Sequence, residues 1–117
     1  MSKTATALLI KFAMTFIVAA ASFAILEENS WGWVALLAVA VTALNYFLGD
    51  LFILPRFGNI VAAVSDGILG AITAAIIAAF VPDFRVTLAT LALFAILLAI
   101  GEFFLHKYLR RSEKVEP

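Results

Sequence analysis

Apolar residues fill four long stretches of the chain, and short polar segments separate them. Each stretch is close to the ~20 residues that an α-helix needs to cross a hydrocarbon core of about 30 Å. We therefore expect an all-α integral membrane protein with helices at about residues 5–26, 31–54, 60–81 and 86–105. Connections of four or five residues make consecutive helices antiparallel neighbours. The sequence predicts one antiparallel four-helix bundle over residues 1–117, ending in a short basic tail at 106–117.

The composition supports a membrane protein. Hydrophobic residues make up 65% of the sequence and charged residues 14%, which excludes an ordinary soluble domain. The first stretch has some features of a secretory signal peptide, but Lys11 interrupts it and its length exceeds that of a signal core. We therefore expect it to be a retained helix. Because the chain has no cysteine, disulfides, thiolate metal sites and thiol nucleophiles are excluded.

The basic residues are distributed unevenly across the predicted membrane. Of the eight Lys and Arg residues, only Arg85 falls on one side of a four-pass topology. The other seven are Lys3, Lys11, Arg56, Lys107, Arg110, Arg111 and Lys114. Basic residues favour the cytoplasmic side, so we expect both termini to be cytoplasmic. The basic tail is expected to contact anionic lipid, and no nucleic-acid partner is expected.

One turn between helices carries strong chain-reversal signals. Pro55 lacks a backbone N–H and disfavours helix at Leu54, so the second helix is expected to end at Leu54. Gly58 and Asn59 then allow the chain to reverse into the third helix.

Every predicted helix carries a charged residue at a similar depth in the membrane. Counted at ~1.5 Å per residue, these positions lie roughly 6 to 10 Å inside the cytoplasmic face. They are Lys11, Asp50, Asp66 and Glu102. Arg56 can reach the same layer from the turn at Pro55. Further polar residues stand near it: Thr15, Asn45, Asn59 and His106.

Charges within a membrane are costly, roughly 2.5 to 3.5 kcal/mol for a lone charge at its centre, so they are expected to pair. The sequence therefore predicts a buried ionic cluster of Lys11, Asp50, Arg56, Asp66 and Glu102. In one interpretation, ion pairs such as Asp50 with Arg56 or Asp66 with Lys11 staple helix ends together. In the other, three carboxylates face two permanent cations. One acid is then neutral, pairs with protonated His106 or holds a cation, as a proton- or cation-coupled site requires.

Enzymatic signatures are missing from the sequence. A His-Glu-x-x-His metalloprotease motif needs more than the one histidine present. Ser22 and Ser65 have no histidine at comparable depth to act as a base. We therefore expect a protein that is not an enzyme, with no catalytic residue, no metal site and no cofactor.

Three strings of residues resemble a known family. They are Leu8 to Phe12, Gly49 to Asn59, and Ser65 with Asp66. These strings resemble the YndM-like family of small four-helix bacterial membrane proteins of unknown function, and the resemblance covers essentially the whole chain. It implies a bacterial cytoplasmic membrane, and it implies recurring polar positions at Lys11, Asp50, Arg56, Asn59 and Asp66.

Two functions are consistent with these features. The first is a structural or interaction module in which the cluster fixes the bundle and the turn at residues 55–59 meets a membrane protein partner or a second copy. The alternative is a small proton- or cation-coupled channel or transporter that acts as an oligomer, because about a hundred residues enclose only a narrow path.

Overall fold

The computed structural model describes residues 2–111, with side chains described for residues 2–108, and every regular element in this range is helical. Helix α1 (Lys3–Ala19) continues into the π-helical segment η1 (Ala20–Ile25). Helix α2 (Trp31–Leu44) continues through the π-helical segment η2 (Asn45–Ile53) into the short helix α3 (Leu54–Phe57). Helices α4 (Asn59–Phe80) and α5 (Leu88–Arg111) follow.

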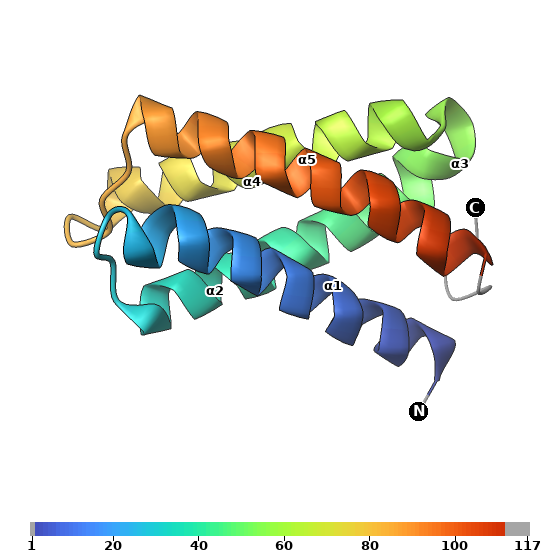
Figure 1. Cartoon of the computed structure of the whole chain (residues 1–117), viewed down its shortest axis with the longest axis horizontal. Helices are drawn as coiled ribbons and strands as arrows, with labels where there is room; N and C mark the ends of the chain where they lie inside the picture. The colour runs from blue at the N-terminus through green and yellow to red at the C-terminus, as the bar shows by residue number, and fades with distance from the viewer. Residues whose placement is uncertain (1, 112–117) are drawn as a thin grey trace.

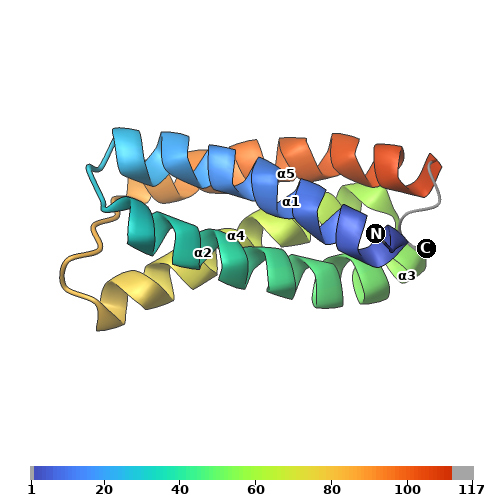
Figure 2. The ribbon, with the colours of Figure 1, turned by 90° about the horizontal axis from the view of Figure 1, so that it is seen from below.

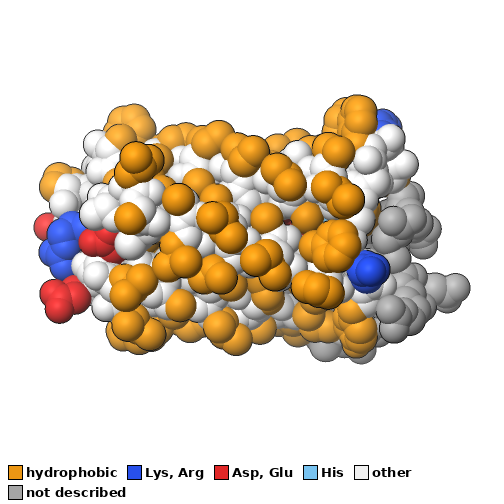
Figure 3. All heavy atoms as spheres, turned by 45° about the horizontal axis from the view of Figure 1, so that its top comes forward, with side chains coloured by type: hydrophobic (Ala, Val, Ile, Leu, Met, Phe, Trp, Pro, Cys, Tyr) orange, Lys and Arg blue, Asp and Glu red, His pale blue; other side chains and the backbone are white. Residues whose placement is uncertain are grey.

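Four continuous helical segments are long and apolar enough to cross a membrane: Lys3–Ile25, Trp31–Phe57, Asn59–Phe80 and Leu88–Tyr108. The start of α1, the turn at α3 and the end of α5 lie at one end of the molecule, and the two other connections lie at the opposite end (Figures 1 and 2). Figure 3 shows one face on which hydrophobic side chains cover the middle and charged side chains lie towards the ends. This surface suits a multi-pass membrane protein.

Hydroxyl side chains cap the starts of α2 and α5. Ser30 Oγ accepts a 3.4 Å hydrogen bond from the backbone N–H of Trp33 at the start of α2. Before α5, Thr87 Oγ1 accepts from the N–H of Thr90 at 3.1 Å, and Thr90 Oγ1 accepts from the N–H of Thr87 at 3.0 Å. Such reciprocal caps satisfy backbone donors that have no partner within the helix.

Pro55 led us to expect that the second span ends at Leu54, but the helix continues beyond it. Pro55 lies within one continuous helical segment, Trp31–Phe57, directly after η2. Its missing N–H removes one helical hydrogen bond but does not end the helix. The span ends instead at Gly58, whose N–H donates to Leu54 O at 3.0 Å. The φ of Gly58 is 89°, a conformation that glycine adopts without steric cost. Gly58 therefore reverses the chain into α4.

The last span also differs from the sequence prediction. Helix α5 extends to Arg111, so residues 106–111 of the expected tail are helical. The remainder of the tail lies outside the described residues. The predicted lipid contact of the tail depends mainly on side chains beyond residue 108, so it stays a prediction.

Two apolar clusters form the core. The larger contains Phe23, whose ring centroid lies 5.7 Å from that of Phe84 and 5.0 Å from that of Phe94. The smaller lies nearer the α3 end and contains Ala7, Leu54 and Ala62. Along each span, the predicted charged residue lies between the parts that belong to these two clusters.

Helices α4 and α5 make the most extensive contact between elements. Glycine allows this approach, because a Cβ on Gly67 would overlap Ala95 O, and a Cβ on Gly70 would lie 2.5 Å from Leu98 Cδ2. Small residues let membrane helices pack backbone against backbone.

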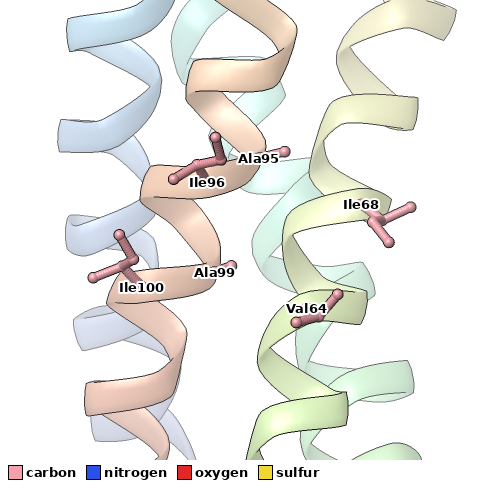
Figure 4. Close-up of a pocket in the computed structure, with 6 residues that line it drawn as sticks. All are labelled: Val64, Ile68, Ala95, Ile96, Ala99 and Ile100. Carbon is pink, nitrogen blue, oxygen red and sulfur yellow. The ribbon is translucent and has the colours of Figure 1, made fainter.

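An apolar groove of about 330 Å³ runs beside this contact (Figure 4). Its lining side chains come from α4 and α5: Val64, Ile68, Ala95, Ile96, Ala99 and Ile100. Ile68 and Ile96 are 52% and 58% exposed, so the groove opens on the outer surface of the helices. None of the six lining residues belongs to the predicted charged layer.

Candidate functional site

Five ionisable side chains meet in the interior of the molecule, and together we call them the buried ionic cluster. They are Lys11 on α1, Asp50 on η2, Asp66 on α4, and Glu102 and His106 on α5. All are 0% exposed except His106, at 1%. Each of the four membrane-length segments therefore contributes at least one charged or chargeable group.

Lys11 joins two of the carboxylates. Its Nζ lies 2.5 Å from Glu102 Oε1 and 3.1 Å from Asp50 Oδ2. Lysine donates up to three hydrogen bonds and is a compact point charge, so it can hold carboxylates from two other helices at once. This contact ties α1 to η2 and α5.

His106 contacts the same two carboxylates and also that of Asp66. Its Nε2 lies 2.9 Å from Asp50 Oδ1, 3.2 Å from Asp66 Oδ2 and 3.4 Å from Glu102 Oε1. Its Nδ1 lies 2.7 Å from Asn59 Oδ1. Asn59 in turn donates from Nδ2 to Phe103 O at 2.9 Å. The imidazole is thus held between an amide at the start of α4 and three acids.

Asn45 adds a neutral donor to the site. Its Nδ2 lies 3.3 Å from Glu102 Oε2 and 3.4 Å from Asp66 O. Its Oδ1 is buried without a hydrogen-bond partner among the described residues, as is Asp66 Oδ1. Buried polar atoms are normally satisfied, so these unpaired oxygens mark the site as unusual.

The π-helical winding of η2 explains why Asn45 and Asp50 both face inward. At about 100° per residue, an α-helix would place two side chains five residues apart on directions about 140° apart. A π-helix bonds residue i to residue i+5 and so brings such a pair onto one face. Asn45 and Asp50 are accordingly both fully buried. The π-helical segment is therefore what lets the second span present two polar groups to the cluster.

Gly49 makes room for one of the acids. A Cβ at this position would overlap Asp66 Oδ1 and would lie 3.0 Å from Asp66 Cγ. The backbone of η2 therefore passes directly against the Asp66 carboxyl group, and only glycine fits there without displacement.

Arg56 does not join the cluster, and the prediction that it would was wrong. Its side chain is exposed and donates from Nη1 to Phe52 O at 3.1 Å. Its guanidinium also lies 4.3 Å from the centroid of the Phe52 ring. Because the helix continues through Pro55, Arg56 stays on an outer face of α3 instead of turning back into the layer.

The remaining predicted positions divide into two groups. Asn45, Asn59 and His106 contact the cluster or form part of it, as described above. Thr15 is fully buried, one helical turn from Lys11, but its hydroxyl oxygen has no partner among the described residues. The central place of His106 was missed, although its spacing of four residues from Glu102 puts both side chains on one face of a helix.

Because His106 and not Arg56 belongs to the cluster, the balance between its acidic and basic groups differs from the predicted one. Three carboxylates now face one permanent cation, Lys11, and one histidine. Four donor atoms, one each from Asp50, Asp66, Glu102 and His106, lie within 4.8 Å of one another. Within the described part of the chain, these four residues form a group that could hold a cation.

A comparison with protein families gives one match. The family described as "Protein of unknown function (DUF2512)" matches residues 2–116, which is nearly the whole chain. No curated protein and no solved structure matches the chain. The sequence-based expectation of a family of unknown function is confirmed at that level, and the match transfers no activity.

Proposed function

We propose that the chain, which belongs to the family of proteins of unknown function DUF2512, is a non-enzymatic, four-span protein of the bacterial cytoplasmic membrane. In this proposal its spans form an antiparallel bundle with both termini in the cytoplasm, and the buried ionic cluster holds them together. The supporting observation is that all four spans contribute fully buried ionisable groups to one cluster.

The cluster is buried between two apolar parts of the core, so these contacts contribute to the stability of the fold. Breaking a buried ion pair by removing one partner leaves an uncompensated charge and costs about 3–5 kcal/mol. Lys11 is the only lysine or arginine within the cluster among the described residues. Loss of its charge would leave the Asp50 and Glu102 carboxylates repelling each other inside the bundle.

Lys11→Met tests this role, with Arg56→Gln as the matched control. We expect Lys11→Met to lower the free energy of unfolding in detergent by about 3–5 kcal/mol. Arg56→Gln should change it by less than about 1 kcal/mol, because Arg56 is exposed. Equal effects of the two substitutions would contradict a stabilising role for the cluster.

The turn at α3 supports an interaction role at the cytoplasmic end. Phe57 is 61% exposed, and Arg56 stands beside it with its side chain turned outward. We propose that this surface contacts a membrane protein partner or a second copy of the chain. A photo-crosslinking amino acid at Phe57 should capture a discrete adduct in intact membranes. The same probe at Phe47, which is 63% exposed on a membrane span, serves as the comparison. Adducts of equal yield at both positions would speak against a specific site.

The charge balance of the cluster favours a second candidate. Three carboxylates against one permanent cation suit a site that exchanges a cation, so a small cation-coupled channel or transporter acting as an oligomer is the alternative. Proton and monovalent-cation flux into liposomes that contain the wild-type protein tests it. Flux that disappears in folded Asp66→Asn protein would favour transport, and silence under a pH gradient and an applied potential would leave the structural role.

A further inference from the structure

The arrangement around His106 Nε2 is unusual for an ordinary hydrogen bond. Three carboxylate oxygens surround it at 2.9, 3.2 and 3.4 Å, yet Nε2 has no hydrogen-bond partner of acceptable geometry among the described residues. A single N–H points along one direction and serves one acceptor well. A cation coordinated by all four atoms would account for this arrangement.

The proton on the histidine ring can be placed from its neighbours. Asn59 Nδ2 donates to Phe103 O at 2.9 Å, which fixes the orientation of the Asn59 amide because a carbonyl oxygen only accepts. Asn59 Oδ1 therefore faces His106 Nδ1 at 2.7 Å, so Nδ1 carries the proton and donates it. In the neutral ring, the lone pair of Nε2 then points at the three carboxylates.

This is the arrangement that a metal-binding histidine requires. A ligating imidazole donates its other N–H to an oxygen, which orients the ring and fixes the tautomer. Asn59 fills that role here. The histidine is 1% exposed, so its Nε2 and the carboxylate oxygens meet in a site shielded from water.

The charges point in the same direction. A metal binds the neutral imidazole and ionised carboxylates, and in that state the three carboxylates and Lys11 leave two negative charges for the ion to balance. Buried charges are paired or coordinate metals. A divalent cation would balance the site.

We propose that Asp50, Asp66, Glu102 and His106 form a binding site for a divalent first-row transition metal ion. Their four donor atoms lie within 4.8 Å of one another. Tetrahedral coordination at metal–ligand distances of 2.0–2.2 Å separates the ligands by roughly 3.3–3.6 Å. The contacts of Nε2 already fall close to this separation, and small side-chain movements suffice for the carboxylates.

The ligand types select the class of metal. Imidazole nitrogen suits zinc, iron and other transition metals, whereas magnesium and calcium prefer sites made of oxygen alone. Three carboxylates extend the range to manganese. Lys11 is not one of the ligands. Its Nζ contacts Asp50 Oδ2 and also Glu102 Oε1, the oxygen that faces His106 Nε2.

The single histidine of the chain allows a direct test. Full-length protein is purified in detergent, stripped with chelator and labelled with ¹⁵N-histidine. Binding of Zn²⁺ should shift the Nε2 resonance while Nδ1 remains protonated. Calorimetry should give one Zn²⁺ or Mn²⁺ per chain, with Mg²⁺ and Ca²⁺ at least tenfold weaker.

Variants identify the ligands. His106→Gln and Asp66→Asn should weaken Zn²⁺ binding by more than the roughly 10–100-fold that loss of a group supporting a ligand costs. Asp83→Asn, which changes an exposed loop carboxylate, should not alter it. Should a variant fail to fold, the wild-type spectrum still decides the matter. Stripped wild-type protein that binds neither ion, or binds Zn²⁺ with an unmoved Nε2 resonance, overturns the proposal, as does undiminished binding by folded His106→Gln.

The site is the cluster of the proposed function, but the two proposals fail separately. Unfolding of Lys11→Met and Arg56→Gln in chelator-treated buffer tests the structural role without metal. Metal binding with no stability difference between those variants would leave the metal site alone standing.

Discussion

Asn59 and His106 stand 47 residues apart in the chain, yet Asn59 Oδ1 lies 2.7 Å from His106 Nδ1. This hydrogen bond connects the first residue of α4 to a buried residue of α5. Because Asn59 Oδ1 can only accept, Nδ1 carries the proton of this bond, and Nε2 is the ring nitrogen that faces the carboxylates. The orientation of the cluster therefore depends on a neutral residue at its edge.

Substitutions of Asn59 should separate acceptor loss from side-chain loss. Asn59→Leu leaves the buried Nδ1–H without an acceptor, so we expect the free energy of unfolding to fall by about 1–3 kcal/mol. Asn59→Asp keeps an acceptor for His106 and should be less destabilising. Thermal and denaturant unfolding in detergent compare the two. A fall in stability that is the same for both variants would show that the acceptor is not what matters.

The contact between Gly49 and Asp66 gives a prediction with an internal control. Gly49→Ala places a Cβ against Asp66 Oδ1 and forces the carboxyl group or η2 to move, so we expect destabilisation by about 1–3 kcal/mol. Gly32→Ala adds a Cβ with no heavy atom within 4 Å, inside α2, and should be neutral or slightly stabilising. Differential unfolding of the two variants is the measurement. Comparable stability for both would mean that η2 does not approach Asp66 as closely as described.

The opposite end of the molecule depends on a reciprocal pair of hydrogen bonds. Asn29 Nδ2 donates to Arg85 O at 2.7 Å, and Arg85 N donates to Asn29 Oδ1 at 2.7 Å. The Arg85 guanidinium also donates to Glu27 O at 2.9 Å and Glu28 O at 3.1 Å. These bonds fasten the connection after η1 to the connection before α5.

Asn29→Ala removes both reciprocal bonds at a side chain that is only 5% exposed. We expect the loss of about 1–3 kcal/mol in unfolding free energy, because two hydrogen bonds to the backbone of Arg85, each worth about 0.5–1.5 kcal/mol, disappear. Hydrogen exchange should accelerate at residues 26–30 and 82–87 and remain slow in the middle of α4. Asp83→Asn, in the same loop but exposed, is the control. Unchanged exchange in Asn29→Ala would rule out this fastening role.

The helical spans could be predicted from the sequence, because they depend on local features of the chain. Long apolar runs admit only helices in a membrane, because every backbone group must be satisfied within the segment. Helix ends were less secure. Pro55 signals a helix stop, but the helix continues through it from η2 into α3, and the second span ends at Gly58.

For the site, too, some features could be predicted from the sequence and others could not. A common depth for Lys11, Asp50, Asp66 and Glu102 could be counted from the rise of a helix, since depth depends only on the distance from a helix end. Direction around the helix axis could not be counted for Asp50, because the π-helical winding of η2 changes the angle between successive side chains. The spacing of His106 from Glu102 indicated a shared helix face, but the orientation of the His106 ring depends on the Asn59 amide from another span, and no local pattern identifies that partner.

By itself, then, the sequence determined four apolar spans and charged residues at one depth within them, because hydrophobicity and helical rise act locally along the chain. Sequence similarity also determined membership in a family of unknown function. Only the tertiary structure decided that His106, and not Arg56, completes the cluster. It also decided that Gly49 admits the Asp66 carboxyl group and that Asn59 orients the imidazole. These features depend on the rotation and close approach of separate helices, which are settled by packing between segments distant in the chain.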